Sequence, residues 1–345
     1  MGRQSHIRYI SGGVTAPKGF LASGVAVGIK YSGRKDVALI YSVHPATVAG
    51  VFTTNYVKAA PVLVGQKVVR SGVAQAIVTN SGCANACTGE GGYRDAVETA
   101  RLTGHQLNMP AGRVIVCSTG AIGKRLPMDK IRKGISEAAI RLSPSGGQSA
   151  AQAILTTDLV TKEVAVEFSV GSHKVRIGGV AKGSGMIHPN MATMLAFITT
   201  DAKISRALLK KLLQGAVDES FHRVTVDKDQ STNDTVLLLA NGASDVEIRP
   251  KTRALQLFQD GLTAVCIALS RMIARDGEGA TRLIEIHVTG ARDVQSAAKI
   301  ARQIAGSDLV KTAVHGGDPN VGRILGAAGA ADVPIDEKRL RLWVG

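Results

Sequence analysis

The sequence is poor in aromatic residues and in cysteine, and both shortages limit what the protein can be. Phe, Trp and Tyr together make up 3% of the 345 residues, too few for an obvious surface on which nucleic-acid bases could stack. The four cysteines (Cys83, Cys87, Cys117 and Cys266) form neither a dense disulfide framework nor a CxxC pair. Buried free thiols in a reducing cytoplasm are therefore expected.

Long apolar runs are also missing. No run approaches the ~18 residues that a membrane-spanning helix needs, and the first residues lack the apolar core of a signal peptide. The formal net charge is +15, but Lys and Arg are scattered along the chain without a long basic run. Neither a membrane nor a nucleic acid is therefore expected as a partner.

The chain does have enough apolar residues, at 45%, to bury a substantial core, and its length suits one large domain or two ordinary ones. Strand and helix patterns occur in both halves without strict alternation, which predicts an α/β fold. Strands are expected over 38–43, 48–53, 76–79, 114–117, 163–170, 173–180, 222–226, 235–240, 282–288 and 341–345. Helices are expected over 92–107, 128–142, 205–218, 253–275 and 293–305, with a shorter piece ending near 156.

One stretch, 182–201, combines a loop of Gly, Pro and Asn with the apolar run 194–198. Ala192 and Thr193 stand at their junction. If the chain cut itself there, the freed α-amine of Thr193 could take the proton of its own hydroxyl near neutral pH and make it a nucleophile. The alternative is that Thr193 is simply a β-branched residue that starts a strand.

Three other positions could carry chemistry near such a nucleophile. Thr119 and Gly120 follow a strand and could offer hydroxyl and backbone N–H donors to an oxyanion, although an ordinary turn has the same pattern. Glu278 lies in a glycine-rich turn and could bind a substrate ammonium, or merely be a solvated acid after a helix end. Lys182, beside two glycines, could bind a carboxylate, although most lysines in such a setting are solvated.

Two further segments have weaker signals. The acids of 227–234 lack the Gly and closing Glu of an EF-hand loop, so an Asx-rich turn is favoured over a calcium site. The glycine-rich segment 316–323 could cradle an anion on backbone N–H groups, but no Gly-Lys-Ser/Thr of a P-loop follows it. No metal is expected.

Together these motifs resemble the glutamate N-acetyltransferase family of arginine biosynthesis, also called the ornithine acetyltransferase family. The most specific match is Lys-Gly-Ser-Gly-Met-Ile followed by Pro-Asn-Met-Ala-Thr-Met-Leu, over 182–187 and 189–195. The resemblance covers essentially the whole chain and includes segments 13–20, 49–54, 79–89, 118–120, 231–235, 277–280 and 318–320.

The resemblance implies a self-cleaving enzyme with a two-domain, sandwich-like α/β fold, related to the β-peptidyl aminopeptidases. The cut would separate an α chain, 1–192, from a β chain, 193–345, that begins with the nucleophile Thr193. Thr119 and Gly120 match the oxyanion pair. Lys182, Glu278 and one threonine, Thr156 as first choice and Thr157 as second, match substrate-binding positions.

The implied reaction is ping-pong. Thr193 takes an acetyl group from N2-acetylornithine and passes it to glutamate, with no metal or dissociable cofactor, while acetyl-CoA stays open as a second donor. The family places this reaction in the cytoplasm, in assemblies of two α and two β chains. Two other functions remain: a self-processing aminopeptidase or amidohydrolase, and an inactive remnant.

The chain also departs from the family. The family continues for a few dozen residues past the position of Gly345, with a tail that supplies Asn and Ser/Thr groups to the pocket, and it usually has Trp where Val321 stands. The resemblance therefore implies a substrate pocket without its C-terminal wall, beside intact cleavage residues.

Overall fold

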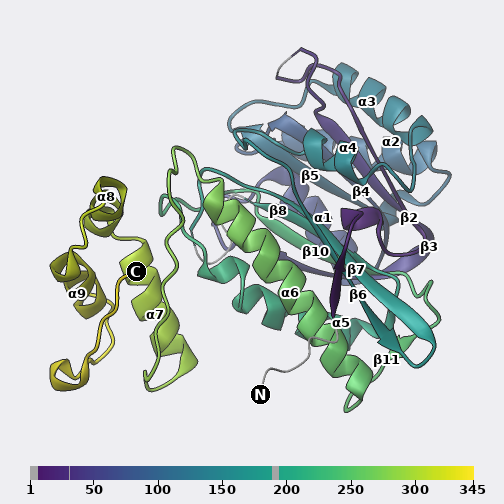
Figure 1. Ribbon diagram of the computed structural model, residues 1–345. Helices are drawn as coiled ribbons and strands as arrows, with labels where there is room; N and C mark the ends of the chain where they lie inside the picture. Colours follow the sequence, from purple (N-terminus) through teal and green to yellow (C-terminus); the bar gives the residue numbers. More distant parts are fainter. Residues whose placement is uncertain (1–6, 31, 189–193) are drawn as a thin grey trace.

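The computed structural model describes residues 7–30, 32–188 and 194–345. Its main feature is a mixed sheet of nine strands, in the order β1-β6-β7-β8-β10-β3-β4-β5, with β2 paired to β3 (Figure 1). These strands are β1 (Arg8–Ile10), β2 (Phe20–Val25), β3 (Val37–Phe52), β4 (Val73–Cys83), β5 (Val114–Ala121), β6 (Lys162–Val170), β7 (His173–Lys182), β8 (Leu195–Thr200) and β10 (Thr235–Ala240). Two short strands, β9 (Lys203–Ile204) and β11 (Glu247–Ile248), pair separately.

The strand β3 bends, and the bend gives the sheet its shape. Its register with β4 breaks between Tyr41 and Ala46, where Pro45 cannot donate a ladder hydrogen bond. Before the break β3 pairs with β2 and β4, and after it β3 pairs with β10 and, at Ala46 and Thr47, still with β4. The two halves of the sheet thus share one core, in which Ile40, Ile77 and Ile115 from one half join Phe197 and Leu237 from the other.

Helices cover the outer faces of both halves. The helices α5 (Arg206–Asp218) and α6 (Arg253–Arg275) pack on the half that contains β6, β7, β8 and β10. On the other half lie α2 (Gly89–Gln106) and α3 (Met128–Ile140), while α1 (Ala60–Ser71) and α4 (Gly147–Ala153) pack against the shared core. Because alternate residues of each strand face opposite cores, this arrangement is the predicted α/β sandwich.

A third group of helices stands apart from the sheet in Figure 1. It comprises α7 (Val294–Ala305), α8 (Asp308–Gly316) and α9 (Val321–Gly329), around a small core of their own that contains Ile300, Ile304 and Val310. Lys228 forms an ion pair with Asp308 at 3.3 Å and so links this group to the body.

Several predicted elements need correction. The segments 38–43 and 48–53 are one continuous strand, β3, rather than two. No strand is present over 222–226, 282–288 or 341–345, all of which are described. The helices α1, α8 and α9 were not predicted. Ser205, where the predicted helix 205–218 begins, instead precedes α5, and its side chain makes no capping hydrogen bond.

The helix α6 is long and apolar enough to cross a membrane by length and composition alone. The sequence-based expectation that no segment is long and apolar enough to span a membrane therefore needs correction for this helix. Its apolar side, however, packs on β6 and β7, where Phe258, Leu262 and Leu269 are fully buried. We therefore interpret α6 as a core helix.

Candidate active site

The site lies where three neighbouring strands have adjacent ends. Lys182, the last residue of β7, pairs with Leu195, the first residue of β8, and Leu195 pairs with Thr235, the first residue of β10. Ala192 and Thr193 lie outside the described residues. Met194, which follows them, is buried at the start of β8. The predicted nucleophile is therefore connected directly to this edge of the sheet.

Asp234 holds the start of β8 in place. Its Oδ1 accepts a hydrogen bond from the backbone N–H of Met194 at 2.9 Å, and the N–H of Thr235 donates to the Met194 carbonyl at 3.1 Å. Asp234 is fully buried, and burial raises its pKa well above the ordinary value. The N–H of Met194, the charge of Lys182 and the hydroxyl of Ser231 only partly oppose that rise.

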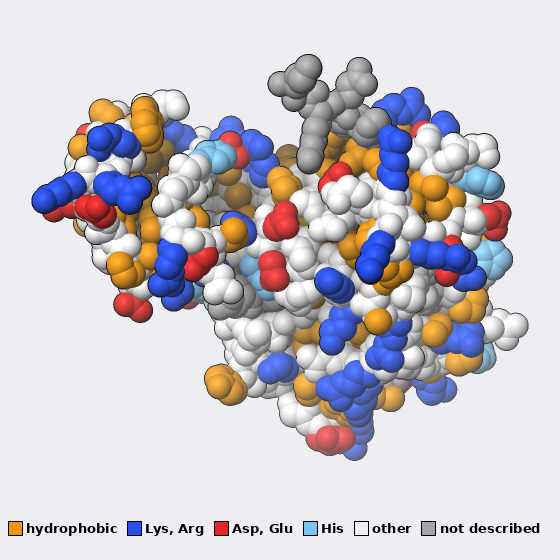
Figure 2. Space-filling model, turned by 90° about the horizontal axis from the view of Figure 1, so that it is seen from below, with side chains coloured by type: hydrophobic (Ala, Val, Ile, Leu, Met, Phe, Trp, Pro, Cys, Tyr) orange, Lys and Arg blue, Asp and Glu red, His pale blue; other side chains and the backbone are white. Residues whose placement is uncertain are grey.

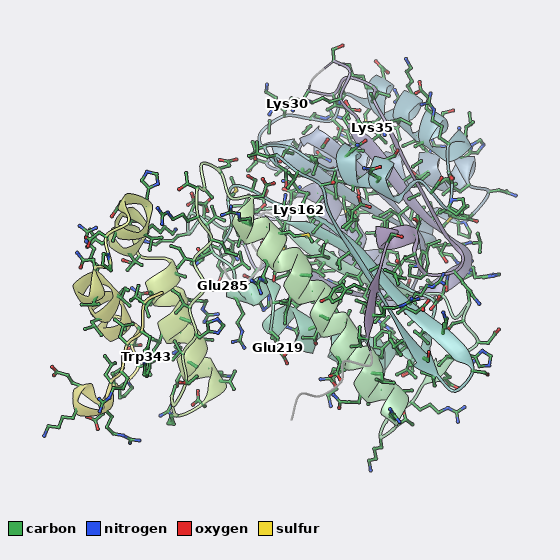
Figure 3. All side chains as sticks on the ribbon, in the orientation of Figure 1. Lys30, Lys35, Lys162, Glu219, Glu285 and Trp343 are labelled. Atoms are coloured by element: carbon green, nitrogen blue, oxygen red, sulfur yellow. The ribbon has the colours of Figure 1, made fainter. Side chains whose placement is uncertain are left out.

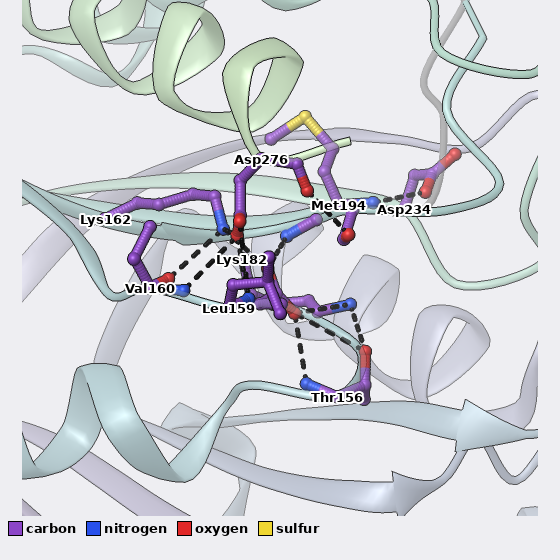
Figure 4. A network of polar contacts seen from close by, with 11 residues as sticks. Thr156, Leu159, Val160, Lys162, Lys182, Met194, Asp234 and Asp276 are labelled. Atoms are coloured by element: carbon purple, nitrogen blue, oxygen red, sulfur yellow. Dashed lines mark hydrogen bonds and ion pairs between the residues drawn. The ribbon is translucent and has the colours of Figure 1, made fainter. Parts of the chain in front are cut away.

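Lys182 is buried as well and is held by two side chains from the loop after α4. Its Nζ donates to Thr156 Oγ1 at 2.7 Å and lies 3.5 Å from Asp158 Oδ2 (Figure 4). Burial lowers the pKa of Lys182, and the carboxylate of Asp158 opposes that shift. Thr157, the second choice at the sequence level, is exposed instead.

Behind Lys182 runs a chain of buried charges that the sequence did not reveal. Asp158 Oδ1 accepts from Lys162 Nζ at 2.8 Å and from the Gly183 N–H at 2.6 Å. Lys162 Nζ also donates to Asp276 Oδ2 at 2.6 Å, just after α6, and Figure 3 shows Lys162 inside the body. Burial alone would raise the pKa of Asp158, but the two ammonium groups outweigh burial and hold it far below its ordinary value.

Glu278 lies on the other side of the glycine-rich turn after Lys182. Its backbone N–H donates to the Ser184 carbonyl at 3.1 Å, and Ser184 Oγ donates to the Asp276 carbonyl at 2.6 Å. A Cβ added at Gly185 would lie 2.4 Å from the carboxyl carbon of Glu278, so glycine there lets this carboxylate approach the turn. Glu278 itself is exposed and available to a ligand.

Thr119 and Gly120 reach the same region from the other half of the sheet. They end β5, and Asn233 connects them to Asp234: its Nδ2 donates to the carbonyls of Ser118 at 2.8 Å and Ala84 at 2.7 Å. Gly120 has a φ of +132°, and a side chain there would clash with the backbone of Gly82. The structure thus connects Ser118, which precedes both predicted oxyanion residues, with the residues before β10.

Other sequence-based interpretations have different outcomes. In the segment 227–234, Asp227 accepts from the N–H groups of Ile187 and Asp229, as an Asx-rich turn should. In the segment 316–323, Asn320 caps α9 through the Arg323 N–H at 3.1 Å, which gives the segment a helix-capping role. Of the four free cysteines, three are buried as expected, but Cys87 is exposed.

Two features of the described residues bear on cofactors and nucleic acid. No group of three His, Cys, Asp or Glu among the residues in the described ranges is arranged to hold a metal ion. Lys and Arg side chains are spread over the body and the C-terminal helices in Figure 2.

Comparison with solved structures shows the class of fold. A β-aminopeptidase from Burkholderia sp. is 11% identical and matches 77% of this chain and 87% of its own, with a TM-score of 0.50. At that identity the match concerns the fold alone. The α/β sandwich is therefore the class of fold that both the topology and this neighbour support.

The particular family follows from closer relatives. The chain matches the ArgJ family over residues 21–345, and it belongs to that family. The arginine biosynthesis bifunctional protein ArgJ of Symbiobacterium thermophilum is 52% identical over 98% of this chain and 85% of its own length. A solved ornithine acetyltransferase of Mycobacterium tuberculosis, in complex with ornithine, is 46% identical and covers 53% of this chain and 98% of its own, with a TM-score of 0.51.

These findings confirm the family resemblance and the α/β fold that were inferred from the sequence. They also confirm membership of a family of acyltransferases in arginine biosynthesis. They do not test the individual roles of Thr193, Thr119, Gly120 and Glu278, which stay predictions.

Proposed function

We propose that this protein transfers an acetyl group from N2-acetylornithine to glutamate, in arginine biosynthesis, through an acetyl-Thr193 intermediate. One observation carries the proposal beyond family membership: a buried ammonium, Lys182, lies 2.7 Å from the hydroxyl of Thr156 beside the start of β8. A buried cation at the edge of a polar site suits a substrate that carries a carboxylate.

The roles of the residues follow from charge. Both substrates are α-amino acid derivatives, so we assign the α-carboxylate to Lys182 with Thr156 and the side-chain ammonium of ornithine to Glu278. In the first half-reaction Thr193 Oγ1 forms a bond to the acetyl carbon, the amide C–N bond breaks, and the hydroxyl proton passes to the departing amine. Thr119 and Gly120 donate to the oxyanion of the intermediate. In the second half-reaction the glutamate amine forms a bond to the acetyl carbon, the ester C–O bond to Thr193 breaks, and a proton of the amine returns to Thr193 Oγ1.

Self-cleavage between Ala192 and Thr193 would first give the α chain, 1–192, and the β chain, 193–345. The length of a relative's chain supports this division. The solved ornithine acetyltransferase chain is matched over 98% of its own length yet covers only 53% of this one, which is about 183 of 345 residues. A natural boundary near 192 would produce such a chain.

We further propose that the reaction needs no dissociable cofactor, that acetyl-CoA is a second donor to be tested, and that two α and two β chains assemble in the cytoplasm. The three buried free thiols suit that compartment.

The test is intact-mass analysis of the purified protein with and without acetylornithine. Two fragments that separate at 192/193, with one acetyl group added to the β chain, are expected, and the acetyl group should leave when glutamate is added. In Thr193→Ala both cleavage and acetylation should vanish. Free acetate or amino acids in place of acetylglutamate would favour the aminopeptidase, and an uncleaved, unacetylated chain would favour an inactive remnant.

A further inference from the structure

The carboxylate of Asp276 lies at the end of α6 where a negative charge destabilises a helix. The residue directly follows α6, and its N–H donates to the Met272 carbonyl at 3.1 Å. An acidic side chain at a helix C-terminus is repelled by the partial negative charge of the last carbonyl groups. Asp276 is nevertheless buried, so its presence needs an explanation outside α6.

The loop after α4 provides half of that explanation. Asp276 Oδ2 accepts from Lys162 Nζ at 2.6 Å and from the Leu159 N–H at 3.1 Å, and Oδ1 lies 3.3 Å from the same N–H (Figure 4). Lys162 Nζ also donates to Asp158 at 2.8 Å, and the other oxygen of Asp158 lies 3.5 Å from Lys182 Nζ. Asp276 therefore holds the loop whose side chains surround the buried ammonium of Lys182.

The turn that leads to Glu278 provides the other half. The Asp276 carbonyl accepts from Ser184 Oγ at 2.6 Å, and the Ser184 carbonyl accepts from the Glu278 N–H at 3.1 Å. The carboxyl carbon of Glu278 would lie only 2.4 Å from a Cβ at Gly185, so its side chain packs against the same turn. One residue thus holds, through different atoms, the surroundings of both charged groups to which we assign the substrate.

We propose that Asp276 is a positioning residue that sets the separation between these two subsites, and that this separation selects the acetyl donor by the length of its side chain. The proposal rests on the proposed function, because it takes Lys182 with Thr156 as the carboxylate subsite and Glu278 as the ammonium subsite. Acetylornithine would then span the two. A donor one methylene longer or shorter could pair with both only if one subsite moved.

Burial of the ion pairs explains why the subsites would not move. Lys162 Nζ lies between the carboxylates of Asp158 and Asp276, and the side chains of Lys162 and Asp158 are fully buried. Separating charges is far more costly inside a protein than in water. A shift of the loop after α4 away from α6 would stretch these contacts, so the spacing of the subsites is held against a donor of the wrong length.

The test uses three acetyl donors that differ only in length: N2-acetylornithine, N2-acetyllysine, which is one methylene longer, and N2-acetyl-2,4-diaminobutyrate, which is one methylene shorter. The value of kcat/KM is measured for each, with glutamate as the acceptor. Wild type should prefer acetylornithine by about 10- to 200-fold, because one methylene changes specificity by that much.

The principal variant is Asp276→Asn, which keeps the size of the side chain but places an amide where the Lys162 ammonium and the Leu159 N–H both donate. We expect the preference for acetylornithine to narrow by about five- to tenfold, as the loss of a hydrogen bond to a charged group allows the loop to shift. Loss of folded protein would lower kcat/KM for the three donors equally and would leave their ratio unchanged.

A milder variant and a control accompany it. Ser184→Ala removes the hydrogen bond to the Asp276 carbonyl without changing any charge, so the preference should narrow by only about two- to fivefold. Asp201→Asn is the matched control. Asp201 is also buried, but it lies at the opposite end of β8, where it accepts from the N–H groups of Arg176 at 2.9 Å and Lys18 at 3.0 Å. This variant should keep the wild-type preference.

The outcomes separate the proposal from the proposed function. A narrowed preference in Asp276→Asn and Ser184→Ala, but not in Asp201→Asn, supports the proposal. An unchanged preference in active forms of the first two variants, equal narrowing in all three, or a wild type that uses the three donors equally overturns it and leaves the proposed function standing. If Asp276→Asn does not fold, Ser184→Ala decides alone. A wild type that makes no acetylglutamate from acetylornithine overturns the proposed function, and this proposal with it.

Discussion

The two ends of strand β8 are both held by a buried aspartate, yet they are built differently. At the far end, each oxygen of the Asp201 carboxylate accepts one backbone N–H group, and Asp201 forms no ion pair among the described residues. At the near end, Asp234 accepts the Met194 N–H and is influenced by Lys182, the first member of a buried chain of charges that runs through Asp158 and Lys162 to Asp276.

The difference separates structural from functional use of the same residue type. A carboxyl group that only terminates a strand needs donors and nothing more, and the backbone provides them. Buried charged groups whose hydrogen-bonding capacity is not fully used lower the stability of the folded protein. The near end therefore has features that the fold does not need, which is typical of sites that bind or react.

The largest effect should come from breaking the row of charges at its centre. In Lys162→Met the two carboxylates of Asp158 and Asp276 lose their shared cation and remain buried, so the free energy of unfolding should fall by about 3–5 kcal/mol. Urea unfolding in a Thr193→Ala background, where one intact chain is expected, measures it.

The control for this prediction is Lys174→Met. Lys174 pairs with Glu167 at 3.0 Å, but its side chain is 55% exposed, so we expect a loss of about 1 kcal/mol or less. Equal losses in the two variants would mean that burial does not distinguish the near end of β8 in the way we describe.

The same buried charges show which residues of the site the sequence could predict and which it could not. Lys182, Thr119 and Gly120 were found because glycine-rich turns and family motifs surround them. Lys162 was missed because it begins a strand of alternating pattern, where a lysine is expected to face solvent. Its actual burial depends on Asp158 and Asp276, and the second of these comes from a segment 114 residues away.

The same limit explains the errors in the fold. The helix α6 and the strand β10 have the predicted boundaries because their apolar pattern is long and unbroken. The segment 282–288 alternates as a strand should, yet within the described residues no partner strand pairs with it. A strand needs a neighbour, and the sequence of one segment does not show whether a neighbour is available.

A smaller effect is expected at the first cation of the row. Lys182→Met should remove the proposed contact with the substrate carboxylate, and a hydrogen bond to a charged group contributes about 1.5–3 kcal/mol. We therefore expect kcat/KM for acetylornithine to fall by roughly 10- to 100-fold, chiefly through KM, in steady-state assays. An unchanged KM would place the carboxylate elsewhere, and Lys182→Arg tests whether charge alone is sufficient.

The smallest effect concerns the far end of β8 and depends on pH. Burial raises the pKa of Asp201, so the folded protein holds the Asp201 proton more tightly than the unfolded chain does. Stability from this group is therefore fully present below the unfolded pKa of about 3.9 and is lost as pH rises through the folded pKa. Asp201→Asn cannot titrate, so its unfolding free energy relative to wild type should rise by about 1 kcal/mol from pH 4 to pH 7.

Urea unfolding at matched pH values measures the difference, with both chains in the Thr193→Ala background. A difference that stays constant with pH would show that the backbone N–H groups of Lys18 and Arg176 fully compensate the buried charge, and the two ends of β8 would then differ even more sharply than their contacts suggest.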